Sequence, residues 1–229
     1  MVVFWRGVTL CRRLRFKNMK NRNVALTLIG LIVTLGFPAL PVSRWENEFA
    51  GTPHLIGYEI IWWLVVAAVL GYVCLGERRP LSSIGFRRIG IWDIVIAVLA
   101  AVVIVAGLGV IYYVVFPALH WSEAQAVNQL IATPFWWRFI SVIRAAVGEE
   151  ILFRGYAIER LDELTGRRSV AAVISCLIFT LEHVGSWGWS HVLLAGFGGI
   201  MLTVLYLWRR KLWVNIIAHF IVDGAAVLF

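Results

Sequence analysis

The chain has 229 residues, of which 61% are hydrophobic and only 15% are charged, and its mean hydropathy is +0.83. This composition excludes an ordinary water-soluble globular domain, which is far less apolar. The formal net charge is +8. In a membrane protein, basic loops on one side and attraction to anionic lipid account for such an excess, so no nucleic-acid partner is inferred.

Apolar stretches of membrane length follow one another along the chain, with short connections between them. A helix needs roughly 20 apolar residues to cross about 30 Å of hydrocarbon. By this criterion the hydropathy pattern predicts seven spans, at residues 24–42, 56–75, 91–116, 136–158, 168–185, 189–208 and 212–229. We therefore expect an all-α fold: a polytopic helical bundle embedded in membrane lipids.

Basic residues are concentrated in every second loop between the predicted spans. They gather in the N-terminal segment and in the second, fourth and sixth loops, whereas the third and fifth loops lack such clusters. Because basic loops tend to stay in the cytoplasm, the pattern predicts an inner N-terminus and an outer C-terminus. The first span lacks a convincing cleavage site and is predicted to be retained, and Met19 is an alternative start.

The organisation predicted from these features has three parts. Residues 1–23 form a basic cytoplasmic segment, residues 24–77 hold two N-terminal membrane helices, and residues 78–229 form the core. The three cysteines are scattered and indicate neither a metal site nor a disulfide framework. Short loops and the lack of organelle signals favour the cytoplasmic (inner) membrane of a bacterium.

Ionisable residues interrupt the predicted spans at three places. A charge near the bilayer centre costs at least ~2.5 kcal/mol, so such residues normally face a polar cavity and mark function. The interruptions are Glu149 and Glu150 with Arg154, then His183, then His219 with Asp223. Together they offer the side chains of a metal site or of an acid and base pair inside the membrane.

In the first interruption, helical geometry predicts different roles for two neighbouring glutamates. Glu150 and Arg154 are four residues apart and share a helix face, so the spacing predicts an ion pair between them. Glu149 lies about 100° further round the helix and is left for chemistry. The alternative for this motif is a salt bridge at the end of a helix with no catalytic role.

The two histidines differ in how strongly they indicate a site. His183 follows Phe179 by one turn, and a lone histidine beside an aromatic ring is most often an interfacial residue without catalytic function. Asn215, His219 and Asp223 recur every four residues and form a polar stripe on an apolar helix. In that stripe His219 and Asp223 are predicted either to ligate a metal together or to pair, with Asp223 orienting the imidazole.

These motifs resemble a known family. Glu-Glu-x-x-x-Arg, then Phe-x-x-x-His, then His-x-x-x-Asn/Asp on successive apolar helices is similar to the CPBP (Abi) family of CAAX prenyl protease and bacteriocin-processing proteins. Each motif alone is weak, but here the three follow in order within about 75 residues. The likeness covers roughly residues 78–229 and includes Ser83 to Arg88, which resembles a segment that precedes the family core.

The resemblance implies an intramembrane protease that cleaves membrane-associated proteins or peptides. It makes Glu149 the base that activates water, with His183, His219 and Asp223 completing the site and Glu150 with Arg154 supporting it. His183, His219 and Asp223 would be an acceptable zinc set. Two alternatives for the cofactor stay open: a divalent metal, zinc above all, or glutamate and histidines acting without one.

Two departures from the family pattern and two other function classes remain. Asp223 stands where prenyl-protein proteases have Asn, although many bacterial members have Asp. Glu182 precedes His183, where the family has a small or apolar residue, and we interpret it as a spectator at the outer interface.

Two other function classes stay open. They are a non-catalytic membrane partner of the same family, in bacteriocin immunity or surface-protein display, and a proton-coupled transporter.

Overall fold

The computed structural model describes residues 21–38, 52–122 and 130–228. Residues 1–20 of the predicted basic segment, including Met19, lie outside the described residues. Within the described part of the chain every regular element is a helix, and the all-α fold predicted from composition and hydropathy is confirmed.

Several helices change type along their length. The elements in chain order are α2 (Asn21–Gly36), α4 (Thr52–Gly71) with η1 (Tyr72–Gly76), η2 (Leu81–Ile84), α5 (Ile91–Val110) with η3 (Ile111–Val115) and α6 (Phe116–Ala118), α8 (Phe135–Glu149) with η4 (Glu150–Ile158) and α9 (Glu159–Thr165), α10 (Arg168–Trp187), α11 (His191–Arg209) and α12 (Leu212–Val227). The elements η1, η3 and η4 are π-helical and η2 is a 3₁₀ turn.

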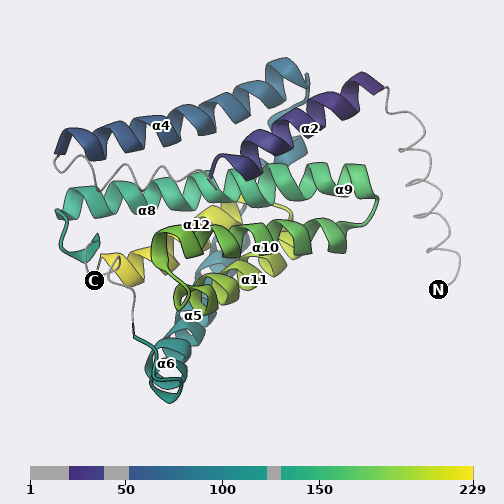
Figure 1. Ribbon diagram of the computed structural model, residues 1–229. Helices are drawn as coiled ribbons and strands as arrows, with labels where there is room; N and C mark the ends of the chain where they lie inside the picture. The colour runs from purple at the N-terminus through teal and green to yellow at the C-terminus, as the bar shows by residue number, and fades with distance from the viewer. Residues whose placement is uncertain (1–20, 39–51, 123–129, 229) are drawn as a thin grey trace, which may run out of the picture.

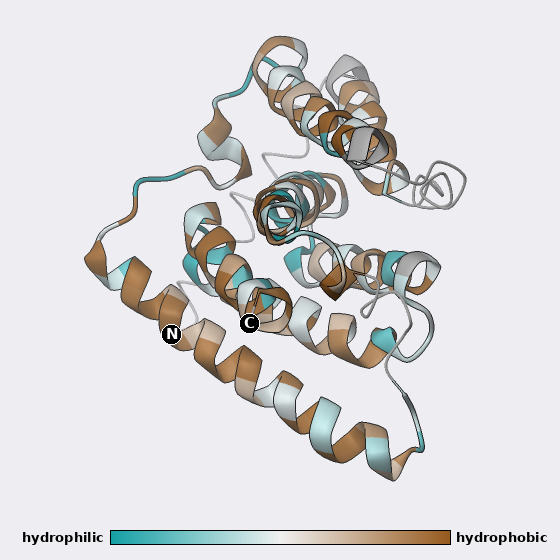
Figure 2. Cartoon of the chain, turned by 90° about the vertical axis from the view of Figure 1, so that its left-hand side faces the viewer, coloured by the Kyte–Doolittle hydropathy of each residue, from teal (hydrophilic) through white to brown (hydrophobic). Residues whose placement is uncertain are grey.

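Each predicted span coincides with a helix, and the chain is an integral membrane protein. Four described helices are long and apolar enough to cross a bilayer, at Ile56–Gly76, Ile91–Ala118, Arg168–Gly185 and His191–Arg209. Val24–Gly36 and Leu212–Val227 are apolar but shorter. Brown, apolar residues dominate the ribbons in Figure 2, as expected for helices whose outer faces contact lipid.

The long helix formed by α8, η4 and α9 organises the bundle. It runs through the middle of Figure 1, with α2 and α4 along one side and α10, α11 and α12 on the other. One buried apolar cluster joins α2 and η1 to the central helix. It includes Leu31 of α2, Val73 of η1, and Leu152 and Ile158 of η4. A second cluster joins α5, α11 and α12. The site described below lies between these two clusters.

The N-terminal helices are held against the central helix at Tyr156. This tyrosine is fully buried, and its hydroxyl donates to Oε1 of Glu77 at 2.8 Å. Gly30 of α2 packs so closely on the ring that a Cβ there would lie 1.7 Å from the tyrosine oxygen. Tyr72 in turn donates to the Leu26 carbonyl at 2.7 Å, which joins η1 to α2.

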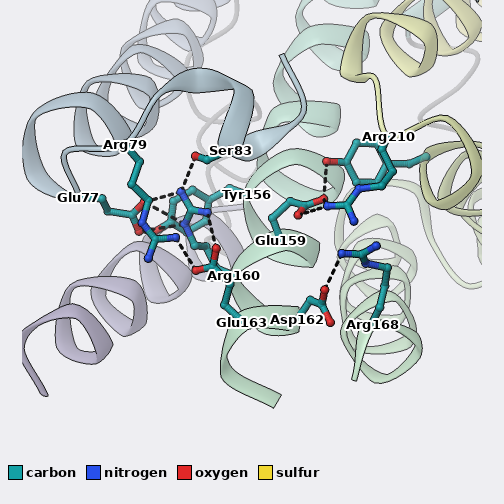
Figure 3. Close-up of polar contacts among 11 residues, drawn as sticks. Glu77, Arg79, Ser83, Tyr156, Glu159, Arg160, Asp162, Glu163, Arg168 and Arg210 are labelled. Atoms are coloured by element: carbon teal, nitrogen blue, oxygen red, sulfur yellow. Dashed lines mark hydrogen bonds and ion pairs between the residues drawn. The ribbon is translucent and has the colours of Figure 1, made fainter. Parts of the chain in front are cut away.

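Charged side chains cluster at one end of the bundle, which we call the basic end (Figure 3). Arg160 is fully buried and donates to Oε2 of Glu77 at 2.6 Å and to the Ser83 hydroxyl at 3.1 Å. Arg210 pairs with Glu159, and Arg168 with Asp162 at 2.7 Å. These pairs explain why the central helix continues to Thr165 instead of ending at the predicted residue 158: its charged residues find partners there.

The motif segment is not the regular α-helix that the spacing argument assumed. From Glu150 to Ile158 the helix is π-helical, a form that is rare and frequent at functional sites. Gly155 in this segment packs on the 3₁₀ turn η2, where a Cβ would lie 2.9 Å from the Ile84 carbonyl oxygen. The widened turns also bring the Phe153 carbonyl within 2.7 Å of the Ser175 hydroxyl, which donates to it from α10.

Candidate functional site

The candidate site lies where the junction of α8 and η4 packs against α12. Glu149 ends α8, Glu150 begins η4, and both stand near the middle of the long central helix. On the facing helix, Asn215 and His219 are one turn apart and buried. The packing of these two helices therefore brings the first and third sequence motifs together.

Glu150 is the centre of a buried polar cluster. Its side chain is 0% exposed, and Oε1 accepts a hydrogen bond from Nη1 of Arg154 at 2.9 Å. The same oxygen lies 3.0 Å from Nδ1 of His219, and Oε2 accepts from Nδ2 of Asn215 at 3.1 Å. The pairing predicted from the four-residue spacing is present. A carboxylate so fully engaged is poorly suited to act as a free base.

Arg154 and Asn215 each reach a second partner on α11. Arg154 donates to the Gly199 carbonyl at 3.2 Å and lies over the Phe179 ring, with 4.2 Å from guanidinium carbon to ring centroid. Asn215 donates to the Leu202 carbonyl at 2.7 Å. A guanidinium on an aromatic face gains a cation–π attraction. These contacts fix the position of Glu150 relative to three helices.

His219 connects this buried cluster to two further carboxylates. Its side chain is 6% exposed; its Nε2 atom lies 3.4 Å from Oδ2 of Asp223 and 3.9 Å from Oε2 of Glu149. Glu149 is 16% and Asp223 30% exposed, so both are more accessible than Glu150. The two more accessible carboxylates therefore lie on the same side of the imidazole, at Nε2.

His183 lies apart from this group. It is on α10, its Nδ1 atom is 2.7 Å from the Phe179 carbonyl oxygen, and its ring centroid is 4.6 Å from that of Phe179. The predicted packing of Phe179 beneath the imidazole is therefore present. Within the described residues, no hydrogen bond or ion pair joins His183 to Glu149, His219 or Asp223.

Glu182 is more buried than the sequence indicated. It is half-buried on α10, and its Oε1 atom is fully buried without a hydrogen-bond partner among the described residues. Its partial burial in the helix packing differs from the interfacial position expected from the sequence, and its role as a spectator stays a prediction.

A second buried ion pair was missed by sequence reasoning. Nε of Arg144 donates to Oε1 of Glu59 at 2.9 Å, with the side chains 13% and 9% exposed. The guanidinium lies 5.1 Å from the ring centroids of both Tyr58 and Trp62. The signal that pointed to it was Glu59 itself, an ionisable residue inside a predicted span.

A hollow of about 370 Å³ opens between α4 and α8 beside this pair. Its lining includes Glu59, Trp63, Trp137 and Ile140, and it does not include Glu149, His183 or His219. This hollow is therefore separate from the candidate site.

The predicted zinc set does not assemble in this arrangement. Among the described residues, no three His, Cys, Asp or Glu side chains are grouped so that they would hold a metal ion. In His219, one ring nitrogen is already engaged by Glu150. Among the described residues, the side chains as placed do not fit a zinc site. Zinc stays a prediction, which elemental analysis of the purified protein can check.

Comparison with known families places this site in context. Residues 131–225 match the family model described as Rce1-like, type II CAAX prenyl endopeptidase. The match confirms the resemblance inferred from the three motifs over this segment, which contains all of the predicted site residues, whereas the predicted likeness of residues 78–130 stays a prediction. It suggests a CAAX protease type of function within the membrane. The curated proteins and the solved structures gave no match.

Proposed function

We propose that the protein is an intramembrane endopeptidase that hydrolyses peptide bonds of membrane-associated proteins or peptides. Glu149 would act as the base that activates water. The support comes from a family match over residues 131–225 and from a polar cluster held inside apolar helices. Short connections between helices, such as Gly166 and Arg167, favour the cytoplasmic membrane of a bacterium as its location.

The arrangement of His219 carries this proposal. Its Nδ1 side is engaged by Glu150 at 3.0 Å, and its Nε2 side faces Glu149 and Asp223 at 3.9 and 3.4 Å. Nδ1–H donates to the engaged carboxylate, so the ring orientation is fixed by the cluster around Glu150. The opposite nitrogen is then presented to the more accessible carboxylates, where a water and a peptide carbonyl can approach.

The proposed reaction uses these groups in two proton transfers. Glu149 takes a proton from a water, whose oxygen forms a bond to the peptide carbonyl carbon and yields a tetrahedral oxyanion. His219, when protonated at Nε2, donates to that oxyanion, and Glu150 with Asp223 balances its charge. When the C–N bond breaks, the proton held by Glu149 passes to the leaving amine nitrogen.

Glu150, Arg154 and Asn215 act as support in this scheme. Their mutual hydrogen bonds keep His219 in one orientation, and a preorganised donor costs no reorganisation at the moment of reaction. His183 belongs to the proposed site through the family motif, on α10. Its free Nε2 would accept a hydrogen bond from the substrate, such as that of the N–H of the scissile amide.

A comparison of membrane proteomes tests this function without knowledge of the substrate. Cells carrying the wild-type protein and cells carrying Glu149→Gln at equal expression would be compared by labelling of new protein termini. Termini that appear with the wild-type protein alone support an endopeptidase. Equal termini with both proteins, together with an unchanged phenotype, would support the non-catalytic partner instead.

A further inference from the structure

His191 lies beside His183 although none of the three sequence motifs includes it. It is the first residue of α11, and the connection from α10 consists of Gly188 to Ser190. Gly188 has φ of +80° and ψ of 174°, a conformation essentially restricted to glycine. This sharp reversal places the start of α11 against the end of α10 and thereby brings the two imidazoles together.

The two imidazoles lie parallel. Their ring centroids are 6.0 Å apart and their planes differ by 10°. The indole of Trp187 lies on His191 as well, at 5.3 Å and 25°. Phe179 contacts His183 on the same helix at 4.6 Å. These separations are within the range of 4.5 to 7 Å over which aromatic rings attract one another.

The His183 ring is thus fixed by two different contacts. Nδ1 lies 2.7 Å from the Phe179 carbonyl, which can only accept, so Nδ1 carries the proton and Nε2 keeps its lone pair. A hydrogen bond to one nitrogen still lets the plane of the ring rock about that bond. A parallel neighbour at 6.0 Å opposes this rocking.

We propose that His191 is a positioning residue for His183. Its ring, supported by Trp187, keeps the His183 imidazole in the plane in which Nδ1 donates to the Phe179 carbonyl and Nε2 is presented to substrate. This role rests on the proposed function, because the orientation of His183 matters for rate only if His183 takes part in hydrolysis. The contact of His191 is with another side chain and not with the reacting atoms.

The kinetic test distinguishes the effect of a flat ring at position 191 from the effect of side-chain volume. The probe is an internally quenched peptide that ends in a prenylated Cys-aliphatic-aliphatic-Met sequence, and the enzyme is the full chain in detergent. His191→Leu should lower kcat roughly tenfold with KM within about twofold of wild type, because misplaced catalytic groups cost rate more than binding. His191→Phe keeps a flat ring and should retain most of the wild-type kcat.

The control variant is Trp189→Leu in the same connection. Trp189 is 72% exposed, so its replacement should leave kcat and KM unchanged. Equal loss of kcat in His191→Phe and His191→Leu would overturn the proposal, since the flat ring would then be irrelevant. An unchanged kcat in His191→Leu would overturn it as well.

A spectroscopic measurement tests the positioning separately from the activity. In protein labelled with ¹⁵N-histidine, the His183 signals are assigned by their loss in His183→Asn. Wild type and His191→Phe should show one tautomer protonated at Nδ1, and His191→Leu should show both tautomers. A single unchanged tautomer in His191→Leu would overturn the positioning role. If the wild-type protein cleaves no peptide while the tautomers respond as expected, the proposed function fails and the positioning role stands.

Discussion

Glu150 and Arg154 form an ion pair of 2.9 Å on successive turns of one helix, with side chains 0% and 1% exposed. Neither charge reaches water or lipid. Breaking such a pair leaves one charge buried without compensation, which makes the remaining partner the main source of instability. The pair is therefore expected to matter more for folding than for chemistry.

Replacing Arg154 with Ala should lower the free energy of unfolding by roughly 3 to 5 kcal/mol. The measurement is unfolding of the detergent-solubilised protein, followed by tryptophan fluorescence. The matched control is Arg168→Ala, whose 2.7 Å pair with Asp162 involves an arginine side chain that is 30% exposed. An exposed pair contributes about 0 to 1 kcal/mol, so equal destabilisation by both variants would contradict the expectation.

Glu149→Gln should leave the protein folded and lower peptide cleavage by a factor on the order of 10² or more, because the amide keeps the shape and loses the basicity. The initial rate of cleavage of the quenched prenylated peptide measures this. Glu163→Gln at the basic end serves as the control, because its side chain is remote from the site in sequence and 22% exposed. Retention of the wild-type rate by a well-folded Glu149→Gln protein would remove Glu149 from the reaction.

Two substitutions of His219 separate its structural and chemical contributions. His219→Gln can still donate to Glu150 and should largely keep the stability of the wild type, whereas His219→Ala leaves a cavity and one fewer hydrogen bond at Glu150. Both should reduce cleavage by a factor on the order of 10² or more, comparable with Glu149→Gln. Thermal unfolding and the cleavage assay are measured on the same preparations. Normal cleavage by His219→Gln would show that a hydrogen-bond donor alone suffices at this position.

The basic end of the bundle is predicted to face the cytoplasm. Arginines at this end, such as Arg79 after η1 and Arg160 in α9, come from distant segments of the chain and lie close together. A phosphatase fused after Phe229 should then be active outside the cytoplasm, and a fusion at Arg167 should be inactive there. Activity in the reverse order would invert the orientation of the whole bundle.

Hydropathy alone was enough to find the helices, because length and apolar composition decide whether a segment is stable in a bilayer. Their ends were less predictable. The first span was expected to reach residue 42, yet α2 ends at Gly36, and residues 39–42 lie outside the described chain. The central helix runs past residue 158 because Arg160 is neutralised by Glu77, which lies 83 residues earlier in the chain. No local pattern contains that pairing.

The candidate site was predictable to the extent that its contacts are local. The pair of Glu150 with Arg154 was predicted from their separation of four residues, and it is present although the segment is π-helical and not α-helical. The contact of Glu150 with His219 spans 69 residues and depends on how α12 packs against the central helix. The π-helical widening at Glu150 and the position of His191 depend equally on tertiary packing, so neither could be inferred from periodicity.

Tyr156 shows that the segment carrying the motifs is not the unit that folds. Its ring and hydroxyl are enclosed by Gly30 and Glu77, two residues that precede the matched segment 131–225. A chain trimmed to that segment would keep every motif residue. It would lose the contacts of Gly30 and Glu77 with the buried Tyr156 ring and hydroxyl, and the pairing of Glu77 with Arg160. The helices that contribute no chemistry thus complete the packing of the helix that does, and grafting the motifs onto another bundle would require transplanting these helices with them.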